Sequence, residues 1–338
     1  MRGNDVVNIA DLFDEAIVAR RRTAREPDAG RRRVLGRLAA WLVAPACLMP
    51  PSPAAFANEV ARAAVGAPRR IVVLDWDLTE IVLSLGVVPV GVARPIWYTQ
   101  LDGDPPLPDE VVDTGLLYQP NFEVLQRLAP DLIVITAWHA MLRPLLERIA
   151  PTLTVTLYAP GVAASRGDAY LNMRTQTRYL AHALGREPQA DALLARLDAT
   201  IVRSATQVRE SGAARWPLYA LRPIDGRHVT VYGPQGLFDG VMRELGLTNA
   251  WQGGTDAQGA AETDLAALAQ RPEAGAVLVG MASSGVPPEL AQSPLWRALP
   301  FVKDGRLHSI GKASPTGGPV SAMRFATQLA GALSGATS

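Results

Sequence analysis

Short apolar runs alternate with segments of helical periodicity along most of the chain, and few architectures accommodate this alternation. Residues 71–74 (IVVL) and 132–135 (LIVI) are continuous apolar runs, which are typical of strands buried on both faces of a sheet. Residues 121–128 carry apolar side chains at helical spacing and are followed by the helix-breaking sequence APD. Strands that alternate with helices in this way indicate an α/β fold with a parallel sheet.

One uninterrupted segment separates two such α/β series. Residues 168–184 contain neither glycine nor proline, and their apolar positions are compatible with one long helix. A second helix is expected to extend to about Arg209, and the strand pattern then resumes at 218. The sequence therefore predicts two α/β lobes joined by a single long bridging helix. The expected units are an N-terminal lobe at 68–165, the bridging helix at 166–186 and a C-terminal lobe at 187–334.

The charge and the cysteine count exclude several classes of function. The 338 residues include 33 Lys and Arg against 32 Asp and Glu, so the net charge is +1. Binding of nucleic acid requires an excess of cationic side chains on one face, so we expect no nucleic-acid partner. Cys47 is the single cysteine, which excludes an intramolecular disulfide and a cysteine-based metal site.

The N-terminal region has the order of parts found in an export signal. Three arginines at 31–33 precede an apolar run at 38–49, and Ala55-Phe56-Ala57 provides an A-x-A cleavage site. The apolar run is too short to span about 30 Å of hydrocarbon. We therefore expect a leader and signal peptide at 1–57, resembling the twin-arginine type, and a mature protein in the periplasm. Cys47 as a lipidated cysteine is the weaker alternative, because a proline stands close upstream of it.

Distinctive strings occur from about 68 to 330, namely LGVVPVGV at 85–92, PPLP at 105–108, VDTG at 112–115, PNFE at 120–123, APDLI at 129–133, DGRH at 225–228, NAWQG at 249–253 and PLWRALPFV at 294–302. Together they resemble the strings of the ferrichrome-type, iron-hydroxamate-binding periplasmic proteins of ABC importers. The resemblance implies a class III periplasmic binding protein-like fold and a monomer that is not an enzyme. It also implies that a ferric siderophore binds between the lobes and passes to an ABC permease at the inner membrane.

The ligand that this resemblance implies explains the absence of a metal cluster from the sequence. Three hydroxamates wrap the ferric ion into a neutral complex, so the siderophore supplies every iron ligand and no cofactor or protein metal site is expected. The receptor needs aromatic walls and a few hydrogen-bond donors. The candidate ligand-binding residues are Trp97, Tyr98, Tyr118, Trp138, His139, Arg222 and Trp251. Among them, His139 stands where the family has a tyrosine that contacts hydroxamate, and Trp251 is the tryptophan of NAWQG.

The chain departs from the family pattern at several cleft positions. Leu117 stands where the family has an arginine, and the family's other cleft tryptophans correspond to Leu101, Gln258 and Ser314. The missing donor is expected from Arg94, Arg143 or Arg222, and the identity of the siderophore is left open.

Two carboxylates are candidates for docking on the permease. Glu123 resembles the family's docking glutamate in the first lobe. Asp264 is its expected counterpart in the second lobe, with Glu262 as a close alternative.

Three other functions fit parts of the sequence. The strand at 71–74 followed by Asp75-Trp76-Asp77-Leu78-Thr79 matches the first motif of haloacid-dehalogenase-type phosphatases. That chemistry also needs a lysine followed by an acidic pair, which neither Lys303 nor Lys312 provides. A zinc or manganese receptor is disfavoured because the four histidines are scattered. A haem or cobalamin receptor remains open, since it shares the general fold signature.

Overall fold

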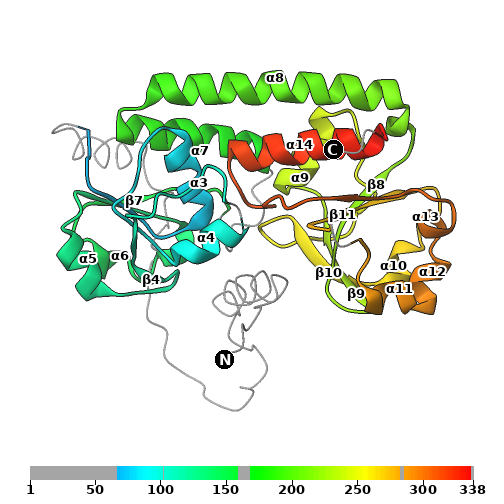
Figure 1. Cartoon of the computed structure of the whole chain (residues 1–338), viewed down its shortest axis with the longest axis horizontal. Helices are drawn as coiled ribbons and strands as arrows, with labels where there is room; N and C mark the ends of the chain where they lie inside the picture. Colours follow the sequence, from blue (N-terminus) through cyan, green and yellow to red (C-terminus); the bar gives the residue numbers. More distant parts are fainter. Residues whose placement is uncertain (1–66, 102, 159–167, 282–284, 336–338) are drawn as a thin grey trace, which may run out of the picture.

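The computed structural model describes residues 67–101, 103–158, 168–281 and 285–335, which form two lobes, each built on its own β-sheet (Figure 1). The predicted leader, its cleavage site and Cys47 lie outside these residues. The predicted α/β fold of two lobes is confirmed. Helix α8 extends over both lobes, with α7 and α14 beneath it (Figure 1).

The first lobe contains a five-stranded sheet in the order β3-β2-β1-β6-β7, with every pairing parallel. Its strands are β1 (Ile71–Val73), β2 (Gly91–Val92), β3 (Val112–Asp113), β6 (Leu132–Ile135) and β7 (Thr152–Thr154). A two-stranded hairpin of β4 (Gly115–Leu116) and β5 (Gln119–Pro120) follows β3. The helices are α3 (Trp76–Ser84), α4 (Pro95–Leu101), α5 (Phe122–Leu128), the 3-10 helix η1 (Ala137–His139) and α6 (Arg143–Leu146).

The second lobe contains a mixed sheet in the order β10-β9-β8-β11-β12. Strands β8 (Leu218–Pro223), β11 (Gly275–Val279) and β12 (Leu307–Ile310) are parallel, whereas β9 (His228–Tyr232) is antiparallel to both β8 and β10 (Ala260–Asp264). Its helices are η2 (Ala213–Arg215), α9 (Leu237–Glu244), α10 (Leu265–Leu268), α11 (Pro288–Gln292), α12 (Pro294–Ala298), α13 (Pro300–Lys303) and α14 (Pro319–Leu333).

The bridge between the lobes is larger than the sequence predicts. Helix α7 (Ala169–Leu184) begins at the N-cap Asp168 and ends at Gly185, whose φ of 62° is the left-handed conformation that glycine adopts readily. Helix α8 (Glu187–Ser211) returns alongside it after two residues. Both helices bury residues in the core of each lobe, so a helical pair rather than one helix joins the lobes.

The start of helix α14 is tied to the first lobe by a buried carboxylate. Glu80 of α3 accepts hydrogen bonds from the backbone N–H groups of Gly318 (3.2 Å), Val320 (2.9 Å) and Ser321 (3.1 Å), and from the Ser321 hydroxyl (2.5 Å). These N–H groups have no intrahelical acceptor at a helix N-terminus, so Glu80 caps a helix of the other lobe. Burial raises the pKa of Glu80 to about 7, although the hydrogen bonds from Ser321 and Gly318 act in the opposite direction.

Candidate functional site

The aromatic candidates of the first lobe follow the carboxyl ends of its parallel strands. Trp97 and Tyr98 are on α4 after β2, Tyr118 is in the hairpin after β3, and Trp138 and His139 are on η1 after β6. Because parallel strands end at the same edge of a sheet, these side chains gather there. We call this group, together with Trp76, the aromatic edge.

Two pairs of rings are in contact at the aromatic edge. The rings of Trp76 and Trp97 are 5.8 Å apart, and those of Tyr118 and His139 are 5.2 Å apart. The indole N–H of Trp76 donates to the Ala93 carbonyl at 2.7 Å. Trp76 was not among the residues predicted for the site, because it falls within the D-x-D-x-T motif. Its place directly after a buried strand was the signal that would have identified it.

Tyr98 is placed differently from the prediction. It is fully buried on α4, and its hydroxyl donates to the Pro105 carbonyl at 2.7 Å. The sequence proposed Tyr98 as a ligand-binding residue, but Pro95 begins a helix on which Tyr98 is turned into the lobe. Only Trp97 of this pair is partly exposed. Tyr98 is therefore an interior member of the aromatic edge.

His139 is also engaged within the protein. Its side chain is fully buried, and its Nε2 lies 2.8 Å from the Leu117 carbonyl, which can only accept. The ring is therefore protonated at Nε2, and Nδ1 accepts from the Thr136 hydroxyl at 3.0 Å and its backbone N–H at 3.3 Å. The predicted donation from His139 to a ligand needs a correction, because both nitrogens serve to fix the hairpin and Tyr118.

Trp138 stands next to His139 on η1 and is only partly buried. Tyr118 is likewise half-buried, on the outer side of the His139 ring. Trp97, Tyr118 and Trp138 are thus the predicted first-lobe residues whose rings retain exposed surface at this edge.

Trp251 of the second lobe packs closely against two glycines, Gly233 and Gly253, which together form what we call the glycine slot. A Cβ atom on Gly233 would lie 2.3 Å from Trp251 Cδ1, and one on Gly253 would lie 2.7 Å from its Cζ2. Both distances are far below van der Waals contact, so these positions require glycine. Gly233 and the NAWQG string therefore contribute to the same feature, a half-buried indole that packs against two glycines.

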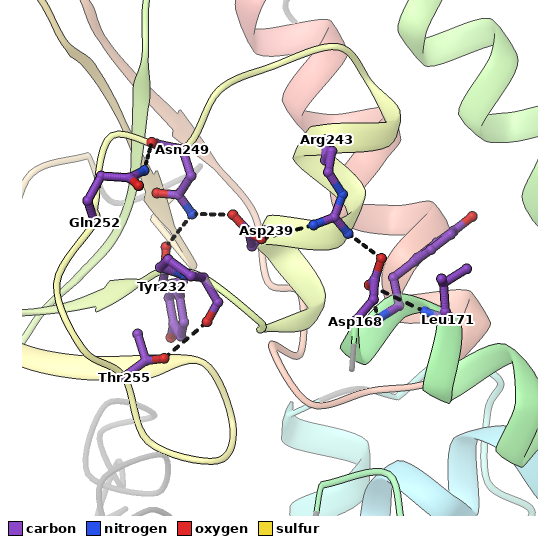
Figure 2. A network of polar contacts seen from close by, with 10 residues as sticks. Asp168, Leu171, Tyr232, Asp239, Arg243, Asn249, Gln252 and Thr255 are labelled. Atoms are coloured by element: carbon purple, nitrogen blue, oxygen red, sulfur yellow. Dashed lines mark hydrogen bonds and ion pairs between the residues drawn. The ribbon is translucent and has the colours of Figure 1, made fainter. Parts of the chain in front are cut away.

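A polar network fixes the Trp251 loop and reaches the bridge (Figure 2). Asn249 Nδ2 donates to the Tyr232 carbonyl (3.1 Å) and to Asp239 (3.0 Å), while Asn249 Oδ1 accepts from the Trp251 N–H (3.0 Å). Arg243 of α9 pairs with Asp239 and with Asp168, the N-cap of α7. The position of Trp251 is therefore coupled to the start of the bridging pair.

Arg222 lies on strand β8 and is buried. It is directly opposite Thr230 of β9, which is in turn opposite Glu262 of β10. Opposed residues of antiparallel strands point to the same face of a sheet, so Arg222 and Glu262 share a face. The structure thus places Arg222 among polar neighbours in the second lobe, apart from the aromatic edge.

The two predicted docking carboxylates occupy helix N-termini. Glu123 is exposed in the first turn of α5, after the N-cap Asn121. Asp264 is exposed and caps α10, because its Oδ1 accepts from the Ala267 N–H at 2.9 Å. Asp264 therefore stabilises the N-terminus of α10, independently of any contact with a permease.

The D-x-D-x-T sequence has structural roles at the lobe boundary. Asp75 caps α3 by accepting from the Leu78 N–H at 3.2 Å. Asp77 accepts from the Ser314 hydroxyl of the other lobe at 3.1 Å. Among the described residues, no group of three or more His, Cys, Asp or Glu side chains could hold a metal ion, and no helix is long and apolar enough to cross a membrane.

Comparison with known proteins gives consistent relatives. The model of the family described as periplasmic binding protein matches residues 71–313. The iron(3+)-hydroxamate-binding protein FhuD of Escherichia coli is 34% identical over 285 residues, which cover 84% of this chain and 93% of that protein. The Fe(3+)-citrate-binding protein YfmC of Bacillus subtilis is 27% identical over 258 residues. The match covers 72% of this chain and 73% of that protein.

A solved structure agrees with these relatives. The siderophore-binding protein FhuD from Vibrio cholerae, bound to Fe3+-Desferal, superposes with a TM-score of 0.72 at 26% identity. The match covers 80% of this chain and 99% of that one, so it includes both lobes.

Proposed function

The chain belongs to the periplasmic binding protein family, and on that premise we propose that it captures a ferric hydroxamate-type siderophore and delivers it to an ABC permease. The observation that carries the proposal is the aromatic edge, where Trp97, Tyr118 and Trp138 keep exposed ring surface at the carboxyl ends of parallel strands. Ligands of open α/β sheets bind at such edges.

The chemistry of a ferric trihydroxamate suits these residues. The complex is neutral and its outer surface is largely apolar. Aromatic rings can therefore bury that surface without the free-energy cost of removing charged groups from water. Trp251, in its glycine slot, provides a rigid aromatic surface from the second lobe, and Arg222 adds a polar donor there. In this proposal Tyr98 and His139 position the first-lobe rings rather than contact the ligand.

The proposal assigns no catalysis and no cofactor to the protein. Iron is cargo, and the siderophore provides its ligands. The relatives are binding proteins, and the aspartates of the phosphatase-like motif serve as a helix cap and a contact between lobes. We further propose that the protein acts as a monomer in the periplasm after removal of residues 1–57.

A ligand panel tests the function. Quenching of tryptophan fluorescence is measured while the purified protein is titrated with ferric Desferal, ferrichrome, ferric citrate, haemin and cyanocobalamin. We expect saturable quenching by the ferric hydroxamates and weaker quenching by metal-free Desferal. Saturable binding of haemin or cyanocobalamin, with none of the ferric hydroxamates, would identify the protein as a receptor of another kind.

A further inference from the structure

Arg94 has an unusual backbone conformation at the carboxyl end of β2. Its φ is 45°, in the left-handed region that side-chain-bearing residues adopt at a cost in free energy. The conformation is held from the neighbouring hairpin, since the Arg94 N–H donates to the Gly115 carbonyl at 3.1 Å and to Asp113 Oδ1 at 3.2 Å. Asp113 Oδ1 also accepts from the Gly115 N–H at 2.8 Å. Strained residues that a fold holds in place occur preferentially at binding sites.

The strained backbone directs the guanidinium onto the aromatic edge. The Arg94 Cζ atom is 5.0 Å from the centre of the Trp97 ring, within the range of a cation–π contact. Asp113 is a distant counter-ion, with 4.0 Å between the charged atoms, and both side chains are more than a third exposed. Nε of Arg94 is buried without a hydrogen-bond partner among the described residues, which adds to the cost of this arrangement.

The other arginines considered from the sequence are less suited to the first lobe. Arg143 donates to Glu147 at 2.8 Å and to Thr154 at 2.9 Å, so its guanidinium is committed to α6 and β7. Arg222 lies in the second lobe, on the same sheet face as Glu262. Leu117 itself is buried, and its carbonyl accepts from His139.

We propose that Arg94 is the cationic hydrogen-bond donor of the first lobe. The inference rests on the proposed function and deepens it. The guanidinium, stacked on Trp97, donates to the negatively polarised oxygens of a ferric hydroxamate or carboxylate complex. The donor thus comes from the end of β2 and not from the hairpin position that Leu117 occupies.

The experiment asks whether the positive φ of Arg94 is required for ligand binding or for folding. Arg94→Gly removes the guanidinium and relieves the positive φ, so we expect an unchanged or higher melting temperature together with an affinity for ferric Desferal lowered about tenfold or more. Arg94→Lys keeps the charge without the planar fork and should lose less affinity. Ala129→Gly is the matched control, because Ala129 has a φ of 44° at the end of α5. It should bind as the parent does.

Two results would overturn the inference. Arg94→Gly that binds ferric Desferal as tightly as the parent shows that the ligand does not use the guanidinium. Loss of thermal stability together with affinity in Arg94→Gly, but not in Ala129→Gly, shows that Arg94 has a folding role. If the parent protein binds none of the ferric complexes, the proposed function fails, and this inference fails with it. Titration of the parent protein alone distinguishes that outcome from a failure of the inference about Arg94.

Discussion

At the scale of single residues, the slot around Trp251 shows how glycines allow an aromatic side chain to be held rigidly. Gly233 and Gly253 leave space that the indole fills, and Asn249 fixes the backbone of the same tryptophan. An aromatic side chain held in this way loses little conformational freedom when a ligand arrives, which favours tight binding.

The slot gives a sharp comparison between two neighbouring glycines. Gly253→Ala places a methyl group 2.7 Å from Trp251 Cζ2 and must displace the indole, whereas Gly254→Ala meets nothing within 4 Å. We expect Gly253→Ala to lower the affinity for a ferric hydroxamate about tenfold or more, because a displaced aromatic anchor loses its contacts. Gly254→Ala should bind as the parent does. Equal affinities for the two variants, measured by fluorescence titration, would show that Trp251 lies outside the site.

The sequence predicted which residues lie together at this edge of the first lobe but not their orientation. Trp97, Tyr98, Tyr118 and His139 do lie together, because strand ends can be recognised from apolar runs. Which of them turn inward depends on tertiary contacts. The Leu117 carbonyl that engages His139 is 22 residues away, and no pattern in the sequence marks that pairing.

At the scale of elements, local signals predicted several helices closely and missed others. The helix ending at Gly185 and the one after Asn121 were found almost to the residue. Helix α4 was missed because its seven residues show little helical periodicity. Strand β10 was missed as well, since its sequence AAETD is a poor strand former and is stabilised by pairing with β9.

The burial of Glu80 at the start of α14 makes stability depend on pH. The pKa of Glu80 is 4.5 in the unfolded reference and about 7 in the folded protein, where burial dominates. Between these values the folded form holds a proton that the unfolded form has lost, so the free energy of unfolding falls as pH rises. At about 1.4 kcal/mol per pKa unit, the decrease amounts to about 3 kcal/mol over this range.

Glu80→Gln removes this titration and should flatten the pH dependence between pH 4.5 and 7. His308 acts in the opposite direction, because burial lowers its pKa, so the informative quantity is the difference between parent and variant. Denaturant unfolding at pH 5, 6 and 7 measures it. Parallel pH profiles for the two proteins would mean that Glu80 does not titrate in this range.

At the scale of the whole molecule, the proposed delivery to a permease requires a surface that both lobes present together. Glu123 and Asp264 are exposed, one on each lobe. Rim charges of this kind govern encounter and register more than affinity. Glu123→Gln and Asp264→Asn remove the charges conservatively, and Asn keeps an oxygen that can cap α10.

We expect both docking variants to bind a ferric hydroxamate normally and to lose most uptake of radiolabelled iron in cells that depend on this protein. Glu110→Ala, which removes an exposed carboxylate elsewhere on the first lobe, is the control and should retain uptake. Normal uptake by the Glu123→Gln, Asp264→Asn double variant would exclude these residues from docking.

The helical pair has a consequence for how the protein unfolds. Ala190 and Leu193 at the start of α8 complete the core of the first lobe, and Leu197, Ile201 and Val208 further along complete that of the second. Neither lobe can close its interior without a helix that the other also needs, so the two sheets form one cooperative unit. A substitution that disrupts either core should therefore destabilise both lobes, and we expect calorimetry to show a single unfolding transition although the chain is built from two lobes.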